Sequence, residues 1–165
     1  MNKNPKSQNI QLMFNKIAKK YDLMNYIMSL GNHKKWEQEI VDSIKINSKK
    51  TDKILDIACG TGSLTKEIIQ HSSNNEVVGL DFSDGMLKIA KNTVPNLILG
   101  DSHYLPFKKK YFDHITIAYG IRNFENINPN KGAKIKNPSL KINDLMLLYG
   151  LIISIIFNVP LLFKT

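Results

Sequence analysis

Cysteine and arginine are among the residues that occur only once in this sequence. The one cysteine, Cys59, excludes an internal disulfide framework and a zinc site made of several cysteines. The four histidines lie far apart, without the spacing of metal ligands, so no metal site is expected. No apolar segment near the N-terminus predicts a secretory signal, and a cytoplasmic location is therefore expected.

Arginine occurs once, at Arg122, against 22 lysines. Together with 22 isoleucines and 18 asparagines, this bias is typical of A/T-rich coding, which accounts for much of the net charge of +9. The alternative is a functional basic patch that binds nucleic acid or a membrane surface. We expect no nucleic-acid partner. At 165 residues, the chain has the length of one domain.

The chain is organised around residues 53–64, Lys-Ile-Leu-Asp-Ile-Ala-Cys-Gly-Thr-Gly-Ser-Leu. Its apolar start predicts a buried strand, and helical spacing of apolar residues follows over 63–69. Between them, Gly60 and Gly62 predict a tight turn where the backbone can approach a ligand, because no Cβ intervenes. A strand, a glycine turn and a helix in this order are typical of the first part of a doubly wound α/β nucleotide site, whose ligand lies beyond the strand's carboxyl end.

The ligand of this turn is not expected to be a dinucleotide. The turn has neither the third glycine of the dinucleotide fingerprint nor the Gly-Lys-Ser/Thr of a phosphate loop. Instead, Asp56 stands on the strand, four residues before Gly60. A carboxylate there repels a pyrophosphate and accepts hydrogen bonds from an ammonium group. The pattern favours a cationic, amino-acid-like ligand such as S-adenosylmethionine.

A second apolar run, residues 76–81, ends in Asp81, 19 residues beyond Gly62. This is about the distance, roughly 20 residues, at which an acidic residue meets ribose hydroxyls in such folds. The alternative is a helix cap, because Ser83 and Asp84 precede another helical stretch. Combined with the glycine turn, the ribose interpretation is favoured.

Two more strands are predicted, over residues 96–101 and 112–118. The first ends in Asp101, which, with Ser102 beside it, is a candidate acceptor for an adenine amino group. Carboxylates and glycine-bearing loops at the ends of successive strands place polar groups on one rim, as in a ligand crevice.

Helical periodicity runs from Ile10 to about Ile46, and residues 1–9 are expected to be frayed. We expect this region to form a helical cap. Four of its apolar side chains are predicted to pack over the site: Met24, Met28, Leu30 and Trp36.

Four motifs resemble those of the C-methyltransferases of menaquinone and ubiquinone biosynthesis, which are class I S-adenosylmethionine-dependent methyltransferases. The most specific is the N-terminal signature, which fits at every fixed position: Tyr21-Asp22-x-Met24-Asn25-x-x-Met28-Ser29-x-x-x-His33-x-x-Trp36. The cofactor motif, 55–62, is shared by many methyltransferases. The segments Leu105-Pro106-Phe107 and Gly120-Ile121-Arg122-Asn123 complete the resemblance, which covers roughly residues 10–128.

The resemblance implies a fold and a set of cofactor contacts. The fold is α/β, a Rossmann-like methyltransferase sheet with an N-terminal helical cap over residues 1–46 and a cofactor-binding core over 47–128. Beside Asp56, Gly60 and Gly62, it implies that Thr61 contacts S-adenosylmethionine, that Asp81 holds the ribose and that Asp101 and Ser102 frame the adenine. Ala118 stands where the family often has a serine near the cofactor.

The resemblance also implies a substrate, a lipid quinol methylated at a ring carbon. Demethylmenaquinol is favoured, and the benzoquinol of the ubiquinone pathway is the alternative. The ring hydroxyl must lose its proton so that the carbon becomes nucleophilic. Arg122 is a candidate to stabilise the developing phenolate, and Asn123, Tyr21 and His33 are candidates to orient the quinol or a water. Such a substrate makes contact with the inner membrane face plausible.

Residues 129–165 depart from the family, which continues with three further strands. A basic loop is followed by 145–163, 19 residues without a charge, the length of a transmembrane candidate. The leading interpretation is a truncated or frameshifted product, and the alternative is a membrane anchor. The C-terminal half of the sheet is then missing or replaced, and the fourth strand becomes an exposed edge. A cofactor-binding remnant without turnover and a membrane-anchored interaction protein remain as alternatives to the enzyme.

Overall fold

The computed structural model of the chain describes residues 5–44, 51–71, 74–102, 104–108, 110–118, 127–128 and 132–133. Its helices are α1 (Pro5–Met28), α2 (His33–Ser43), α3 (Ser63–His71) and α4 (Asp84–Ala90). Its strands are β1 (Lys53–Ile57), β2 (Glu76–Asp81), β3 (Leu97–Leu99), β4 (His114–Ile117), β5 (Ile127–Asn128) and β6 (Gly132–Ala133). Strands and helices alternate from β1 to β3, as in an α/β fold.

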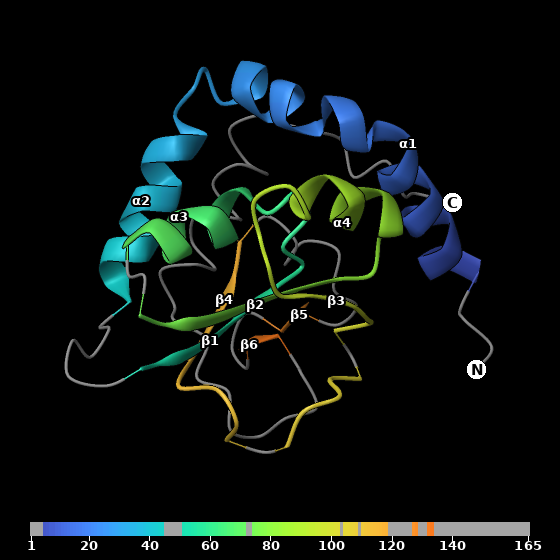
Figure 1. The fold of residues 1–165 in the computed structure, drawn as a ribbon. Helices are drawn as coiled ribbons and strands as arrows, with labels where there is room; N and C mark the ends of the chain where they lie inside the picture. Colours follow the sequence, from blue (N-terminus) through green and yellow to red (C-terminus); the bar gives the residue numbers. More distant parts are fainter. Residues whose placement is uncertain are drawn as a thin grey trace.

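Four parallel strands form the main sheet, in the order β3-β2-β1-β4. The chain moves outward from β1 through β2 to β3 and then returns to pair β4 with the other side of β1 (Figure 1). The strand order therefore reverses between β1 and β4, the point at which open α/β sheets bind ligands. The predicted α/β class is confirmed, and β4 is an outer strand of the described sheet.

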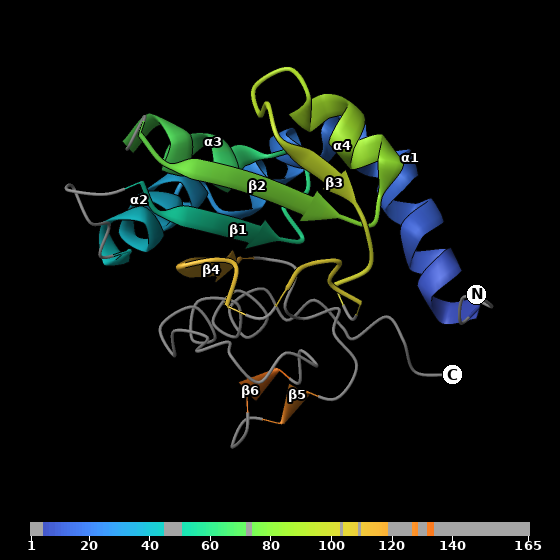
Figure 2. The same cartoon turned by 60° about the horizontal axis from the view of Figure 1, so that its bottom comes forward.

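The helices cover one face of this sheet (Figure 2). Helices α3 and α4 pack on β2, while α2 lies against α3 and α1 lies against α4. The core under α2 and α3 is made of buried apolar side chains: Ile40, Val41, Ile54, Leu64, Ile68 and Val77. Leu64 and Ile68 are four residues apart on α3, so that both point toward the sheet.

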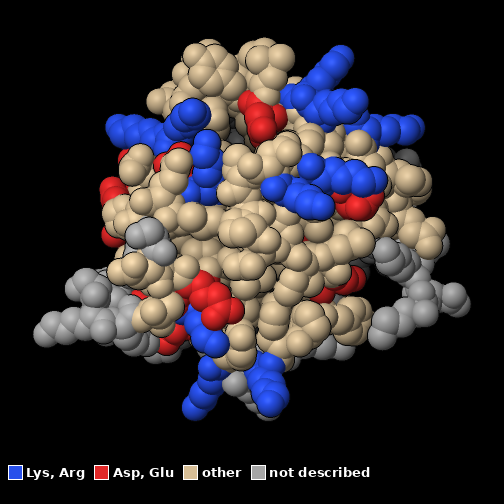
Figure 3. Space-filling view, in the orientation of Figure 1, with Lys and Arg blue, Asp and Glu red and all other residues tan. Residues whose placement is uncertain are grey.

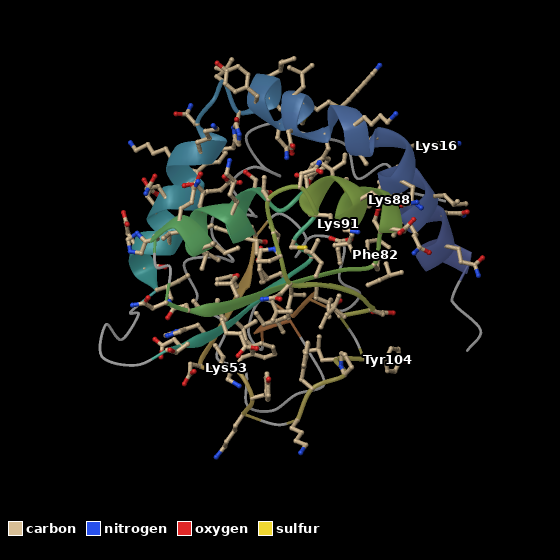
Figure 4. The ribbon with its side chains drawn as sticks, viewed as in Figure 1. Lys16, Lys53, Phe82, Lys88, Lys91 and Tyr104 are labelled. Carbon is tan, nitrogen blue, oxygen red and sulfur yellow. The ribbon has the colours of Figure 1, made fainter. Side chains whose placement is uncertain are left out.

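A loop rich in aromatic residues covers the opposite face. Leu55 and Ile57 of β1 point to this side, because side chains alternate along a strand, and they pack near Phe107 and Phe112. The rings of Phe107 and Phe112 meet edge to face, with their centres 4.7 Å apart. Lys53, at the lower edge of the view in Figure 4, holds its ammonium 4.2 Å from the centre of the Tyr111 ring. Both faces of β1 are therefore covered.

The N-terminal region is helical, as predicted, and it is divided into two helices, α1 and α2. Leu30 and Gly31 adopt φ values of 50° and 80°, and this left-handed pair ends α1 before α2 begins. Helix α1 begins at Pro5, so that residues 5–9, which were predicted to be frayed, belong to it.

The predicted packing of Met24, Met28 and Leu30 over the site is wrong. Their side chains are 42%, 37% and 86% exposed, although Trp36 is half-buried. Helix α1 instead turns another row of residues inward, spaced by three and four positions: Phe14, Ala18, Tyr21 and Asn25. Met24 and Met28 fall outside that row and face outward.

The third and fourth strands are shorter than predicted. Strand β3 covers three residues of 96–101, and β4 covers four residues of 112–118. The described part of the chain contains no helix long and apolar enough to cross a membrane. Residues 145–163, for which a transmembrane segment was considered, lie outside the described residues.

Candidate functional site

The turn after β1 has an unusual backbone. Ala58, Gly60 and Gly62 all have positive φ values, of 55°, 57° and 83°. At Gly62 a Cβ would lie 2.9 Å from Val94 Cγ2 and 3.1 Å from Ala90 Cβ, so no larger residue fits without displacement. The glycines therefore let the turn fold tightly against the segment at the end of α4.

A cavity of about 370 Å³ opens beside this turn. It lies at the reversal point of the sheet, since Ala58 follows β1 and Ala118 follows β4, and both line it. Helices α1 and α2 supply six of its lining residues: Tyr21, Asp22, Asn25, His33, Lys34 and Glu37. Strand β1, the turn and the first residue of α3 supply Asp56, Cys59, Gly60, Thr61, Gly62 and Ser63. The site thus combines two segments that are distant in the sequence.

Asp56 is buried in the cavity wall, with 1% of its side chain exposed. Thr65 of α3 donates to Oδ2 at 2.6 Å, and Thr116 of β4 donates to Oδ1 at 2.8 Å. Burial raises the pKa of this carboxyl to about 6, although both hydroxyl bonds act in the opposite direction. Asp56 therefore ties β1 to α3 and β4, and each of its oxygens already accepts a hydrogen bond.

A second buried carboxyl, Glu37 of α2, lines the same cavity and is only 1% exposed. Ser63, the first residue of α3, donates to its Oε2 at 2.8 Å. Burial raises its pKa to about 7, and the nearby carboxylates Glu67, Asp56 and Asp22 act in the same direction. Sequence reasoning missed this residue. The signal was its spacing, because Glu37 lies three and four residues before the buried Ile40 and Val41.

Tyr21 and His33, the two catalytic candidates within the described residues, both line the cavity. His33 is buried, and its Nδ1 lies 3.0 Å from Ser29 Oγ. Burial lowers the pKa of His33, and Lys34 adds to this effect, so the imidazole is neutral near pH 7. Arg122 and Asn123 lie outside the described residues, and their roles stay predictions.

Thr61 and Asp81 hold the turn in place. Thr61 donates to Asp22 Oδ1 at 2.5 Å, which links the turn to α1. Asp81, at the end of β2, accepts from the backbone amide of Gly60 at 2.8 Å and from that of Ser83 at 2.8 Å. Burial raises the pKa of Asp81. It is not among the residues that line the cavity, and its predicted contact with a ribose stays a prediction.

The helix-cap interpretation of this region is confirmed. Ser83 Oγ accepts from the backbone amide of Met86 at 3.2 Å, which caps α4. In Figure 4, Phe82 lies at the end of β2, below α1, where its ring meets that of Phe14.

Asp101 and Ser102 lie outside the cavity lining, although the backbone amide of the preceding residue, Gly100, donates to the carbonyl of Asp81 at 2.9 Å. They follow the short strand β3, neither lines the cavity, and Asp101 is exposed. The structure therefore brings together Asp56, Gly60, Thr61 and Gly62 with Tyr21 and His33, and not the pair predicted to frame an adenine.

The charged groups around the cavity are complementary to those of an amino acid. The buried wall of the cavity is acidic, whereas Lys34 and Lys66, both exposed, stand at its edge. The acidic wall fits an ammonium group, and the two lysines fit a carboxylate. No group of side chains in the described residues could hold a metal ion.

Comparison with known proteins gives a consistent result. The model of the ubiE/COQ5 methyltransferase family matches residues 2–137. A demethylmenaquinone methyltransferase of Thermotoga maritima is 42% identical over 115 residues, 68% of this chain and 49% of the relative. A ubiquinone/menaquinone biosynthesis C-methyltransferase, UbiE, of Wigglesworthia glossinidia brevipalpis is 40% identical over 132 residues, 74% of this chain and 52% of the relative. The chain thus spans about half the length of these relatives.

Two solved structures support the fold alone. One, from Methanococcus maripaludis and assigned as an S-adenosyl-L-methionine-dependent methyltransferase, has a TM-score of 0.56 at 22% identity, covering 77% of this chain and 57% of the other. CalS10, an amino pentose methyltransferase of Micromonospora echinaspora, has a TM-score of 0.51 at 20% identity, covering 65% and 45%. The family match and the two relatives confirm the resemblance inferred from the sequence motifs, and the solved structures confirm the fold.

Proposed function

Because the chain belongs to the ubiE/COQ5 methyltransferase family, we propose that it transfers a methyl group from S-adenosylmethionine to a ring carbon of a polyprenylated quinol. The observation that carries this proposal is the acidic cavity at the reversal point of the sheet, walled by the glycine turn. Demethylmenaquinol is the favoured substrate, since relatives 42% and 40% identical to this chain are named as demethylmenaquinone methyltransferases. The benzoquinol of ubiquinone biosynthesis is the alternative.

S-adenosylmethionine, when bound, supplies an electrophilic methyl group on a sulfonium. Three features of the chain support its binding: the tight glycine turn at Gly60 and Gly62, the link from Thr61 to α1, and the buried acid in the wall. The neutral imidazole of His33 and the phenol of Tyr21 line the same cavity and are suited to orient a ring hydroxyl or a water. We propose that Arg122 stabilises the phenolate that forms and that Asn123 helps to orient the ring.

We also propose that the chain works at a membrane surface, where a polyprenylated quinol resides. The C-terminal part of α1 exposes Leu23, Tyr26 and Ile27 by 60%, 57% and 61%. Figure 3 shows uncharged side chains at the top of this view, with an acidic group directly below them and lysine or arginine side chains to either side. An exposed apolar surface beside basic residues is suited to an anionic bilayer.

The experiment that tests the function has two steps. Isothermal titration of the purified chain with S-adenosylmethionine measures binding, and methyl transfer to a short-chain demethylmenaquinol then measures turnover. Binding and turnover are both expected. Binding without turnover would leave a cofactor-holding protein in place of an enzyme. The absence of binding would contradict the proposal altogether.

A further inference from the structure

The sequence motif assigns the ammonium of the methyl donor to Asp56, but the hydrogen bonds of Asp56 argue against that role. Both of its oxygens accept from threonine hydroxyls, Thr65 and Thr116, at 2.6 and 2.8 Å. These bonds also tie together β1, α3 and β4. An ammonium that approached Asp56 would have to share or break bonds that hold the fold.

Glu37 is the other buried acid of the cavity, and its bonding is different. Ser63 holds Oε2 at 2.8 Å, and no other described residue donates to this carboxyl. Its side chain is 1% exposed yet lines the cavity, so its second oxygen is available to a ligand while bulk water has little access. A buried carboxyl with only one donor is expected to bind a cation where one fits.

The surroundings of Glu37 match the rest of an amino-acid group. Lys34 lies three residues before Glu37 on α2, and Lys66 lies three residues after Ser63 on α3, so each is a neighbour along its helix. Both lysines line the cavity. In an amino acid, the ammonium and the carboxylate are bonded to the same carbon. When the ammonium binds Glu37, the carboxylate would therefore lie close to these two lysines.

We propose that Glu37, positioned by Ser63, is the carboxylate that binds the α-ammonium of S-adenosylmethionine, while Asp56 organises the fold beneath it. This inference rests on the proposed cofactor. It extends the binding site to α2, an element that the glycine motif does not include.

The role of Glu37 in binding the ammonium can be detected through a change in its ionisation. The pKa of Glu37 is raised to about 7, so the carboxyl of the free protein is largely protonated at pH 6. Pairing with an ammonium requires it to lose that proton. Binding at pH 6.5 should therefore release protons, which calorimetry detects as a heat that changes with the ionisation enthalpy of the buffer. Asp56, His33, Asp22, Glu67, Lys34 and Lys66 also surround this carboxyl, so the contribution of Glu37 is isolated by substitution.

The decisive test compares two ligands on two variants. Methylthioadenosine carries the nucleoside and the sulfur of the donor but has no ammonium. Glu37→Gln should weaken S-adenosylmethionine binding by between about tenfold and a hundredfold, which corresponds to a lost hydrogen bond to a charged group. It should leave methylthioadenosine affinity within about twofold, and it should reduce the proton release. The control Glu39→Gln, on the same helix but not lining the cavity, should change neither affinity.

Several outcomes would overturn the inference. Equal loss of both ligands would make Glu37 a structural residue. Unchanged affinities with slower methyl transfer would make it a group that acts on the quinol instead. If the unmodified chain binds methylthioadenosine but not S-adenosylmethionine, the proposed function fails together with this role. If it binds both ligands and Glu37→Gln changes neither affinity, only this role fails.

Discussion

At the scale of single residues, Ala58 is the clearest sign that the turn is shaped for a ligand. Its φ of 55° is left-handed, and it is one of three non-glycine residues with positive φ in the described chain. Such a conformation costs an L-residue about 1–2 kcal/mol. Residues held in this way gather at ligand sites, where the surrounding structure compensates for the strain.

Replacing Ala58 by glycine should therefore stabilise the protein. Glycine removes the steric cost at positive φ but gains entropy in the unfolded chain, so the expected net increase in the free energy of unfolding is about 0.5–1 kcal/mol. Urea denaturation followed by circular dichroism measures it. Ala90→Gly in α4 is the control at a helical φ, and it should lose about 1–2 kcal/mol, because glycine lowers helix propensity and a buried methyl group is removed. A loss of stability in both variants would contradict the strain at Ala58.

At the scale of helices and strands, the sequence was sufficient to predict an element where residues within the segment mark its start and its end. The run 76–81 was predicted as a strand and is β2, because it is apolar and ends at a carboxylate before a helix cap. The strand–turn–helix around Gly60 was predicted for the same reason. The outward face of Met24 and Met28 was not predicted, since burial depends on which row of α1 meets α4 and not on hydrophobicity.

The residues of the site divide in the same way, into those that a local motif identifies and those that only a tertiary contact identifies. Asp56, Gly60, Thr61 and Gly62 could be found because they adjoin one another in the sequence, and the N-terminal signature led to Tyr21 and His33. Glu37 could not be assigned by motif, because its contact with Ser63 joins positions 26 residues apart. Its place on the buried face of α2 was the only local signal.

The exposed face of α1 leads to a prediction about membranes. Replacing Leu23 and Ile27 together by serine should weaken binding to phosphatidylglycerol-containing vesicles by about tenfold or more, since two exposed apolar side chains are lost. Co-sedimentation of protein with vesicles measures this. Leu99→Ser, at an equally exposed position on β3, is the control and should have no effect. Equal vesicle binding by the double variant and the unmodified chain would place the contact elsewhere.

Binding should also weaken with salt. Lys16, Lys19 and Lys20 are exposed on the same helix, and each lysine near an anionic surface contributes about 1 kcal/mol at low ionic strength. Salt-independent binding would exclude their contribution.

At the scale of the whole molecule, the buried acids make stability depend on pH in an unusual direction. The pKa of Glu37 is raised to about 7 and that of Asp56 to about 6, both by burial. Between their ordinary pKa values, about 4, and these raised values, the folded protein binds more protons than the unfolded chain. The free energy of unfolding must therefore fall as the pH rises through this interval, and it should level off above about pH 8.

The loss should amount to a few kcal/mol between pH 5 and pH 8, since each unit of pKa difference corresponds to about 1.4 kcal/mol. His33, whose pKa is lowered, acts in the opposite sense at the acid end, so substitution separates the contributions. Glu37→Gln should remove about half of the loss and raise the melting temperature at pH 8 above that of the unmodified chain, whereas Glu39→Gln should not. Melting curves at half-unit pH steps measure this dependence. A melting temperature that stays constant or rises from pH 5.5 to pH 8 in the unmodified chain would contradict the raised pKa values of Glu37 and Asp56 in the folded state.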